Sequence, residues 1–199
     1  MEFNISTNIL RDQSKDLKYV VTPNATKIFE RIFSSESSSN KSFTIIGNYG
    51  TGKSTFLWAL EKNLLKEKIF FSAKLNCKYQ SYQFLKIVGD ATSLTYAFQK
   101  VLGLNNKSLK LKDGSSKEII EELEKRRKAS DKKKAGFVIL IDEFGKYLEH
   151  INKNKESNDL YLLQLVSEWA NDADKNTYFL ISLNQNFVSY SSSLDLIDK

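Results

Sequence analysis

Residues 47–54 read GNYGTGKS, and this stretch with its two flanks constrains the fold more than any other part of the sequence. The apolar run before it, FTII at 43–46, is typical of a short buried strand. The segment after it, 55–65, carries apolar residues at helical spacing. A glycine-rich turn that joins a buried strand to a helix indicates an open α/β sheet.

The chemistry of this turn suits a phosphate. Its spacing GxxxxGK[ST] is met by Gly47, Gly52, Lys53 and Ser54. The glycines let successive backbone N–H groups face an anion, and the following helix adds the positive end of its dipole. Lys53 would reach the outer phosphates of a nucleotide, and the Ser54 hydroxyl would ligate Mg²⁺. The alternative is a glycine turn that binds nothing. The candidate nucleotide-binding residues are Gly47, Asn48, Tyr49, Gly50, Thr51, Gly52, Lys53, Ser54 and Thr55.

A second candidate element is FVILIDEF, an apolar run that ends in Asp142 and Glu143. Ligands of open α/β sheets bind at the carboxyl ends of the strands, which is where these acids would lie. Asp142 would hold Mg²⁺ together with Ser54. Glu143 would take a proton from an attacking water. Alone, two acids after an apolar strand fit a solvated strand end equally well.

A third polar position follows the apolar run YFLIS at 178–182. Asn184 is the candidate for contacting the outermost phosphate or the water, with Ser182 as the fallback. The alternative for Asn184 is a simple turn residue after a strand.

The remaining pattern alternates between strands and helices. Thr22-Pro23 is an N-cap followed by a first-turn proline, and it predicts a helix to about Phe33. We expect an early strand within 1–21, a strand over 68–75, and helices over 82–102 and 158–170. Apolar strands alternating with helices predict a three-layer α/β domain whose mainly parallel sheet is covered on both faces.

These motifs resemble the additional-strand class of P-loop ATPases, which includes the AAA+ and STAND families. GNYGTGKS is similar to their Walker A motif and ILIDEF to their Walker B motif with its catalytic glutamate. Asn184 is similar to their sensor 1. The resemblance implies ATP and Mg²⁺ as ligands, ATP hydrolysis coupled to shape change, and an extra strand between the loop strand and the Asp-Glu strand. The stretches DEFGKYLEH and SLNQNFVSY also resemble ATPase subunits of large bacterial and phage-defence complexes.

The chain departs from this pattern after Asn184. The family's fifth strand should follow there and flank the loop strand, but 185–199 is polar and rich in serine. The loop strand would then be a sheet edge unless 1–21 or a partner covers it. Neither an arginine finger nor a second sensor has a candidate. We therefore expect the N-terminal part of a larger ATPase, or a subunit completed by another chain. The expected units are an N-terminal segment (1–21), a P-loop ATPase domain (22–190) and a polar tail or the start of a missing C-terminal part (191–199).

Composition narrows the alternatives. A formal net charge of +6 and the basic run at 125–134 allow a nucleic-acid partner, although a solvated charged surface explains both. There is no apolar run of membrane-spanning length or signal-peptide layout, and one cysteine excludes an internal disulfide, so we expect a cytoplasmic protein.

The absence of an NKxD motif favours ATP over GTP. The rival functions are a nucleotide-gated binding module with little turnover and a phosphotransferase. The latter needs arginines over the phosphates, whereas Arg126 and Arg127 should lie at the opposite end of the sheet.

Overall fold

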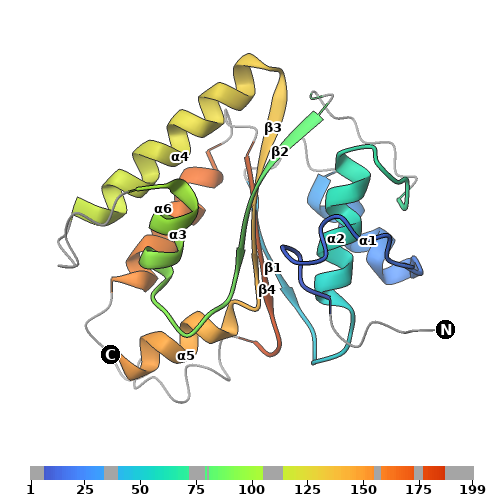
Figure 1. Cartoon of the computed structure of the whole chain (residues 1–199), viewed down its shortest axis with the longest axis horizontal. Helices are drawn as coiled ribbons and strands as arrows, with labels where there is room; N and C mark the ends of the chain where they lie inside the picture. Colours follow the sequence, from blue (N-terminus) through green and yellow to red (C-terminus); the bar gives the residue numbers. More distant parts are fainter. Residues whose placement is uncertain are drawn as a thin grey trace.

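A computed structural model describes residues 7–33, 40–71, 79, 81–104, 114–154, 158–172 and 177–186. It shows the predicted three-layer α/β architecture around a parallel sheet of four strands (Figure 1). The strands are β1 (Ser42–Ile46), β2 (Ser81–Val88), β3 (Ala135–Asp142) and β4 (Thr177–Leu183). The helices are α1 (Pro23–Phe33), α2 (Lys53–Leu64), α3 (Leu94–Leu102), α4 (Gly114–Lys132), α5 (Gly145–Lys153) and α6 (Asp159–Ala170).

The strand order is β1-β4-β3-β2. Strand β4 therefore lies between β1, which leads into the glycine turn, and β3, which ends in Asp142. This confirms the extra strand implied by the family resemblance. The register places Ile46 beside Leu183 and Ile141 beside Ile181, so the carboxyl ends of the three strands meet at one end of the sheet.

Helices cover both faces of the sheet. Helices α1 and α2 lie on one face, and α3, α4 and α6 lie on the other (Figure 1). Strands β3 and β4 are buried along their whole length and contribute to the hydrophobic clusters on both faces. Because a parallel strand covered on both sides has no polar face, the continuous apolar runs of β3 and β4 were readable from the sequence.

The expected helix over 82–102 is wrong in its first part. Residues 81–88 form strand β2, and only 94–102 are helical, as α3. The run SYQFLKIV contains Lys86, which suits the polar side of a helix. In the fold its ammonium is buried, 2.8 Å from the carboxylate of Glu61 on α2. An ion pair thus allows a lysine in a covered strand.

Two expected strands are also wrong where the structure describes them. Residues 68–71 are not a strand: the N–H groups of Phe70 and Phe71 donate to the Asn63 side chain, and Phe71 stacks on Phe29. The rest of that expected strand, 72–75, lies outside the described residues. No strand occurs within 7–21, because Asn8 accepts hydrogen bonds from Leu10 and Arg11 and turns the chain.

Strand β1 is an edge of the sheet formed by the described residues. The carbonyl of Lys41 and the N–H of Gly47, at the two ends of β1, form hydrogen bonds with β4. In a parallel ladder only every second residue bonds the neighbouring strand, and hence the N–H and C=O groups of Thr44 and Ile46 face away from the sheet. The edge expected for the loop strand is therefore present.

Candidate functional site

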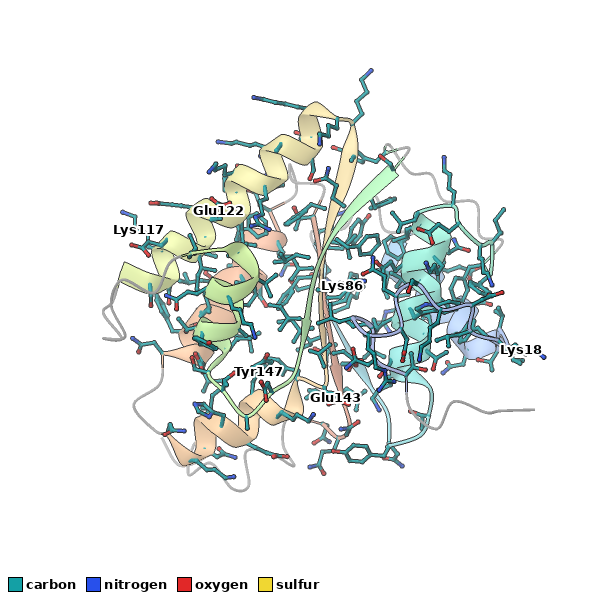
Figure 2. All side chains as sticks on the ribbon, in the orientation of Figure 1. Lys18, Lys86, Lys117, Glu122, Glu143 and Tyr147 are labelled. Atoms are coloured by element: carbon teal, nitrogen blue, oxygen red, sulfur yellow. The ribbon has the colours of Figure 1, made fainter. Side chains whose placement is uncertain are left out.

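The candidate residues converge at the carboxyl end of the sheet, the end at which Figure 2 labels Glu143. The N–H of Gly47 donates to the carbonyl of Leu183 at 3.1 Å, which places the start of the loop beside the residue before Asn184. The N–H of Glu143 donates to Ser182 Oγ at 3.0 Å. Hydrogen bonds therefore tie the ends of β1, β3 and β4 to one another.

The glycine turn has the backbone that its sequence predicts. Gly50 and Gly52 have φ values of 78° and 83°, in the left-handed region that favours glycine. A β-carbon at Gly47 would lie 2.9 Å from Thr51 Oγ1, so this position is also closely packed. Tyr49, at the tip, is 81% exposed. Thr51 closes the turn by donating its hydroxyl to the carbonyl of Asn48 at 2.8 Å.

Lys53 spans this turn. Its Nζ donates to the carbonyl oxygens of Gly47 at 2.6 Å and Asn48 at 2.9 Å. Partial burial lowers the pKa of the ammonium, and the negative charges of Asp142 and Glu143 oppose this effect. The lysine, the loop and both acids thus lie within electrostatic reach of one another.

Helix α2 begins at Lys53 with Gly52 as its N-cap, and no side chain caps it. The first N–H groups of the helix are therefore free of intrahelical partners and available to an anion. The Ser54 hydroxyl makes no hydrogen bond within the described part of the chain. The Thr55 hydroxyl lies 3.0 Å from that of Thr7, so the N-terminal segment contacts this helix.

Asp142 is buried at the end of β3. Its Oδ1 accepts a hydrogen bond from Ser182 Oγ at 2.5 Å and another from the N–H of Glu143 at 3.0 Å. Its second oxygen, Oδ2, has no hydrogen-bond partner among the residues that the structure describes. The carboxylate is thus fixed through one oxygen and has the other available.

Glu143 has a φ of 54°, a left-handed conformation that is uncommon for a residue with a side chain. Its carboxylate pairs with Lys146 on α5 at 2.5 Å. The hydrogen bond with Glu143 raises the pKa of Lys146, although burial works against it. The acid is half-exposed and faces the same end of the sheet as the loop.

Asn184 follows β4 and is half-buried. Its side chain makes no hydrogen bond to the described residues, whereas Ser182 is engaged with Asp142 and Glu143. The sequence suggests Ser182 only as a substitute for Asn184, and no local pattern indicates its role as a support for the acids. Gly89, whose N–H donates to the carbonyl of Asp142 at 2.7 Å, is likewise not among the predicted residues. The pair Gly89-Asp90, which follows the run SYQFLKIV directly, is the local signal that a strand ends there.

These residues fit Mg²⁺ and a nucleotide phosphate. Mg²⁺ prefers oxygen ligands and retains several waters, and the Ser54 hydroxyl and Asp142 Oδ2 are oxygens with no protein partner in the described structure. A β-carbon at Gly50 or Gly52 would touch nothing within 4 Å, so the turn leaves open space above its backbone. Among the described residues, no cluster of three or more His, Cys, Asp or Glu side chains could hold a metal ion.

The basic run at 125–134 is far from this site. It forms the C-terminal part of α4 and the turn into β3, at the opposite end of the sheet (Figure 1). Arg126 pairs with Glu122, and Arg127 pairs with Glu124 at 2.8 Å. This location agrees with the expectation for the two arginines.

Among the helices that the structure describes, none is long and apolar enough to cross a membrane.

Comparison with solved structures identifies the fold. No protein-family model and no curated protein sequence matches the chain. Two AAA+ ATPases have similar structures, each at 16% sequence identity. Caenorhabditis elegans PCH-2 matches with a TM-score of 0.51 over 90% of this chain and 42% of its own. Aeropyrum pernix ORC2, solved as ADPNP-ADP complexes, matches with a TM-score of 0.54 over 94% of this chain and 48% of its own.

The chain therefore has the fold of an additional-strand P-loop ATPase, and it spans less than half the length of either of these AAA+ proteins.

Proposed function

We propose that this domain binds Mg·ATP and hydrolyses it to ADP and phosphate. The observation that carries the proposal is the meeting of Lys53, Asp142 and Glu143 at the carboxyl end of a sheet with the additional-strand order. The structure of A. pernix ORC2, which has a similar fold, was solved with ADPNP and ADP.

Each candidate residue has a role that follows from its position. The backbone of 47–52 and the first N–H groups of α2 would surround the phosphates, with Lys53 moving its ammonium from the loop carbonyls to a phosphate oxygen. Ser54 and Asp142 would hold Mg²⁺, which neutralises phosphate charge when bound. Glu143 would orient the attacking water and accept its proton, and Asn184 would hydrogen-bond the outermost phosphate or that water.

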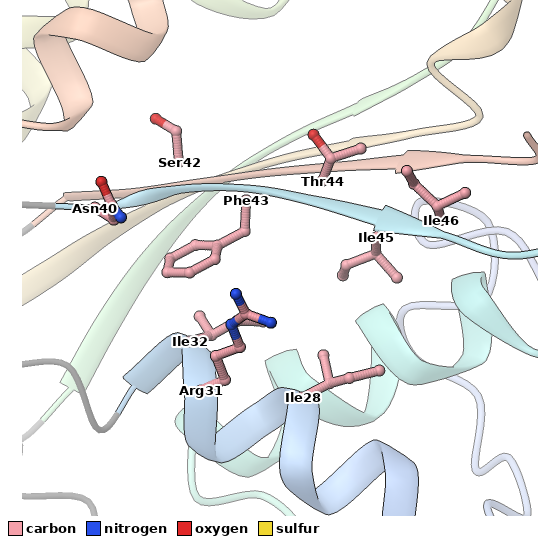
Figure 3. A pocket seen from close by; sticks show the side chains of 9 residues that line it. All are labelled: Ile28, Arg31, Ile32, Asn40, Ser42, Phe43, Thr44, Ile45 and Ile46. Carbon is pink, nitrogen blue, oxygen red and sulfur yellow. The ribbon is translucent and has the colours of Figure 1, made fainter. Parts of the chain in front are cut away.

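The domain is proposed to work with further strands or subunits. The open edge of β1 lines a pocket of about 550 Å³ together with α1, including Arg31 and Phe43 (Figure 3). Ile46 at this edge is 51% exposed. Unpaired strand edges with apolar neighbours are usually covered in the working protein. A segment completing this edge would contact the strand that leads directly into the loop, and hence would couple the nucleotide to the rest of an assembly.

A second function is favoured by one contact. Lys146 holds the carboxylate of Glu143 in an ion pair, and an acid paired in this way is less available to a water. A domain that keeps this pair would bind ATP and turn it over rarely, and the bound state itself would recruit a partner. The phosphotransferase alternative has no such support, because the paired Arg126 and Arg127 lie away from the loop.

The test is the Glu143→Gln variant, which keeps the shape of the side chain and removes its basicity. We expect wild-type protein to release phosphate slowly. The variant should bind ATP with similar affinity and release phosphate at least about a hundredfold more slowly, because a general base contributes about 10²–10⁴-fold. Measurable phosphate release at the same rate by both proteins would contradict the hydrolytic role of Glu143. ATP binding with negligible release by both would favour the nucleotide-gated module.

A further inference from the structure

Gly89, the residue directly after β2, packs against the backbone of Glu143. A β-carbon at position 89 would overlap the carbonyl oxygen of Glu143 and would lie 2.9 Å from its carbonyl carbon and 3.2 Å from its β-carbon. The atoms in the way are mostly backbone, which cannot rotate aside as the end of a long side chain can. Any side chain at position 89 would therefore displace Glu143 or the end of β2.

The backbone of Glu143 is unusual and is held on its other side. Its φ of 54° costs conformational energy and persists only where neighbours enforce it. Its N–H donates to Ser182 Oγ and to Asp142 Oδ1, each at 3.0 Å. The next N–H, of Phe144, donates to the carbonyl of Ser182 at 3.0 Å. Strand β4 thus holds this backbone from one side, and Gly89 touches it from the other.

The end of β2 is itself fixed at this point. The N–H of Gly89 donates to the carbonyl of Asp142 at 2.7 Å. The carbonyl of Val88 accepts a hydrogen bond from the Tyr147 hydroxyl of α5 at 3.1 Å. Position 89 therefore cannot retreat from Glu143 without breaking hydrogen bonds to β3 and α5.

We propose that Gly89 is a positioning residue for Glu143. Because it has no side chain, the end of β2 packs against the left-handed backbone of Glu143, and this contact sets the point from which the carboxylate projects. The proposal rests on the proposed ATPase function, since it concerns the residue given the role of base. Gly89 acts only through Glu143 and has no part in holding the nucleotide.

The test compares Gly89→Ala with wild-type protein for Mg·ATP affinity and for single-turnover phosphate release. We expect the affinity to stay within about threefold and the release to fall about tenfold or more, because small displacements of a catalytic group cost up to about 10²-fold. In the Glu143→Gln background, Gly89→Ala should cause no further fall. A purely structural role would lower the rate in both backgrounds.

The matched control is Gly103→Ala. Gly103 caps α3 with a φ of 71° and has nothing within 4 Å of where a β-carbon would stand, so alanine strains the backbone there without touching the site. It should lower thermal stability and leave phosphate release unchanged. Wild-type release by Gly89→Ala, or an equal fall in the Glu143→Gln background, would overturn the proposal.

A second readout separates this proposal from the proposed function. If the wild-type protein releases no phosphate, the ATPase role fails. The rate of hydrogen exchange at the Glu143 amide then tests whether Gly89 positions the backbone of Glu143. Faster exchange in Gly89→Ala, with no change in Gly103→Ala, supports the packing role, whereas unchanged exchange overturns it. If Gly89→Ala does not fold, Tyr147→Phe removes the hydrogen bond that fixes the carbonyl of Val88, loosens the end of β2 and should speed exchange at the same amide. Unchanged exchange in Tyr147→Phe overturns the proposal.

Discussion

Ser182 on β4 donates a 2.5 Å hydrogen bond to Oδ1 of Asp142 on β3, and both residues are almost completely buried. The same Oγ accepts the N–H of Glu143 at 3.0 Å. One hydroxyl therefore holds both acids of the candidate site at the strand that separates them from the glycine turn. The additional strand thus supports Asp142 and Glu143 directly, in addition to separating them from β1.

We predict that Ser182→Ala lowers the free energy of unfolding by about 1.5–3 kcal/mol, because a buried hydrogen bond to a charged group is worth about that much. Urea denaturation measures this change. Ser81→Ala is the control, since the Ser81 side chain is exposed and makes no hydrogen bond to the described residues, and it should stay within about 0.5 kcal/mol of wild type. Equal values for the two variants would contradict the role of the Ser182 hydroxyl.

The buried ion pair between Lys86 and Glu61 gives a second prediction. Their side chains are 7% and 2% exposed, so Lys86→Met leaves an uncompensated buried carboxylate. We expect a loss of about 3–5 kcal/mol in unfolding free energy, and recovery of much of it when Glu61→Leu is added. Denaturation of the single and double variants tests this. The exposed pair of Lys125 with Glu122 is the control, where Lys125→Met should cost at most about 1 kcal/mol.

Asp12 predicts a pH dependence of stability. Hydrogen bonds from Arg11, Lys15 and the N–H of Asn8 hold the pKa of this buried carboxyl well below its usual range. A depressed folded-state pKa gives stability that is present above the unfolded pKa of about 3.9 and is lost as the pH falls below it. The wild-type protein should therefore exceed Asp12→Asn in stability at pH 7, and the difference should shrink by pH 3.

Urea denaturation of both proteins at the two pH values measures this difference. Asp16→Asn serves as the control, because its side chain is 81% exposed. It should change stability little at either pH. A difference between wild type and Asp12→Asn that is constant from pH 7 to pH 3 would contradict the assigned pairing.

The open edge of β1 predicts a pattern of amide exchange. The amides of Thr44 and Ile46 face away from the sheet, whereas those of Phe43 and Ile45 point to β4. Hydrogen exchange followed by NMR should be fast at 44 and 46 and slow at 43 and 45. The Ser42 amide should be protected as well, since it donates to the Asn171 side chain at 2.9 Å. Equal protection at 43–46 would mean that another segment covers the edge.

Much of the fold could be predicted, for reasons that particular residues make plain. Strands β3 and β4 contain the continuous apolar runs 137–141 and 178–181 because both of their faces are covered, and Thr22 caps α1 by accepting the N–H of Ala25 on its Oγ1 at 3.2 Å. Strand β2 was not predictable because it contains Lys86, a charged residue that does not fit the apolar pattern of a covered strand. Only the ion pair with Glu61, which is distant in the sequence, makes the burial of Lys86 possible.

The candidate site was predictable to the extent that it follows a local spacing. The glycine turn and the Asp-Glu pair are read from consecutive residues, and the structure places them together. The supports from Ser182 and Gly89 depend on contacts between different strands, which no local pattern contains. Their roles therefore emerge only from the arrangement of β2, β3 and β4.

The most direct test of the account is calorimetric binding of ATP in the presence of Mg²⁺ to the wild-type chain and to Lys53→Ala, with GTP as a comparison. We predict saturable ATP binding by the wild-type chain, weaker GTP binding, and ATP affinity at least about tenfold lower in the variant. Circular dichroism would establish that both proteins are folded. ATP binding of equal strength by wild type and Lys53→Ala, or no binding by folded wild-type protein, would contradict the assignment of residues 47–54 as a nucleotide-binding loop.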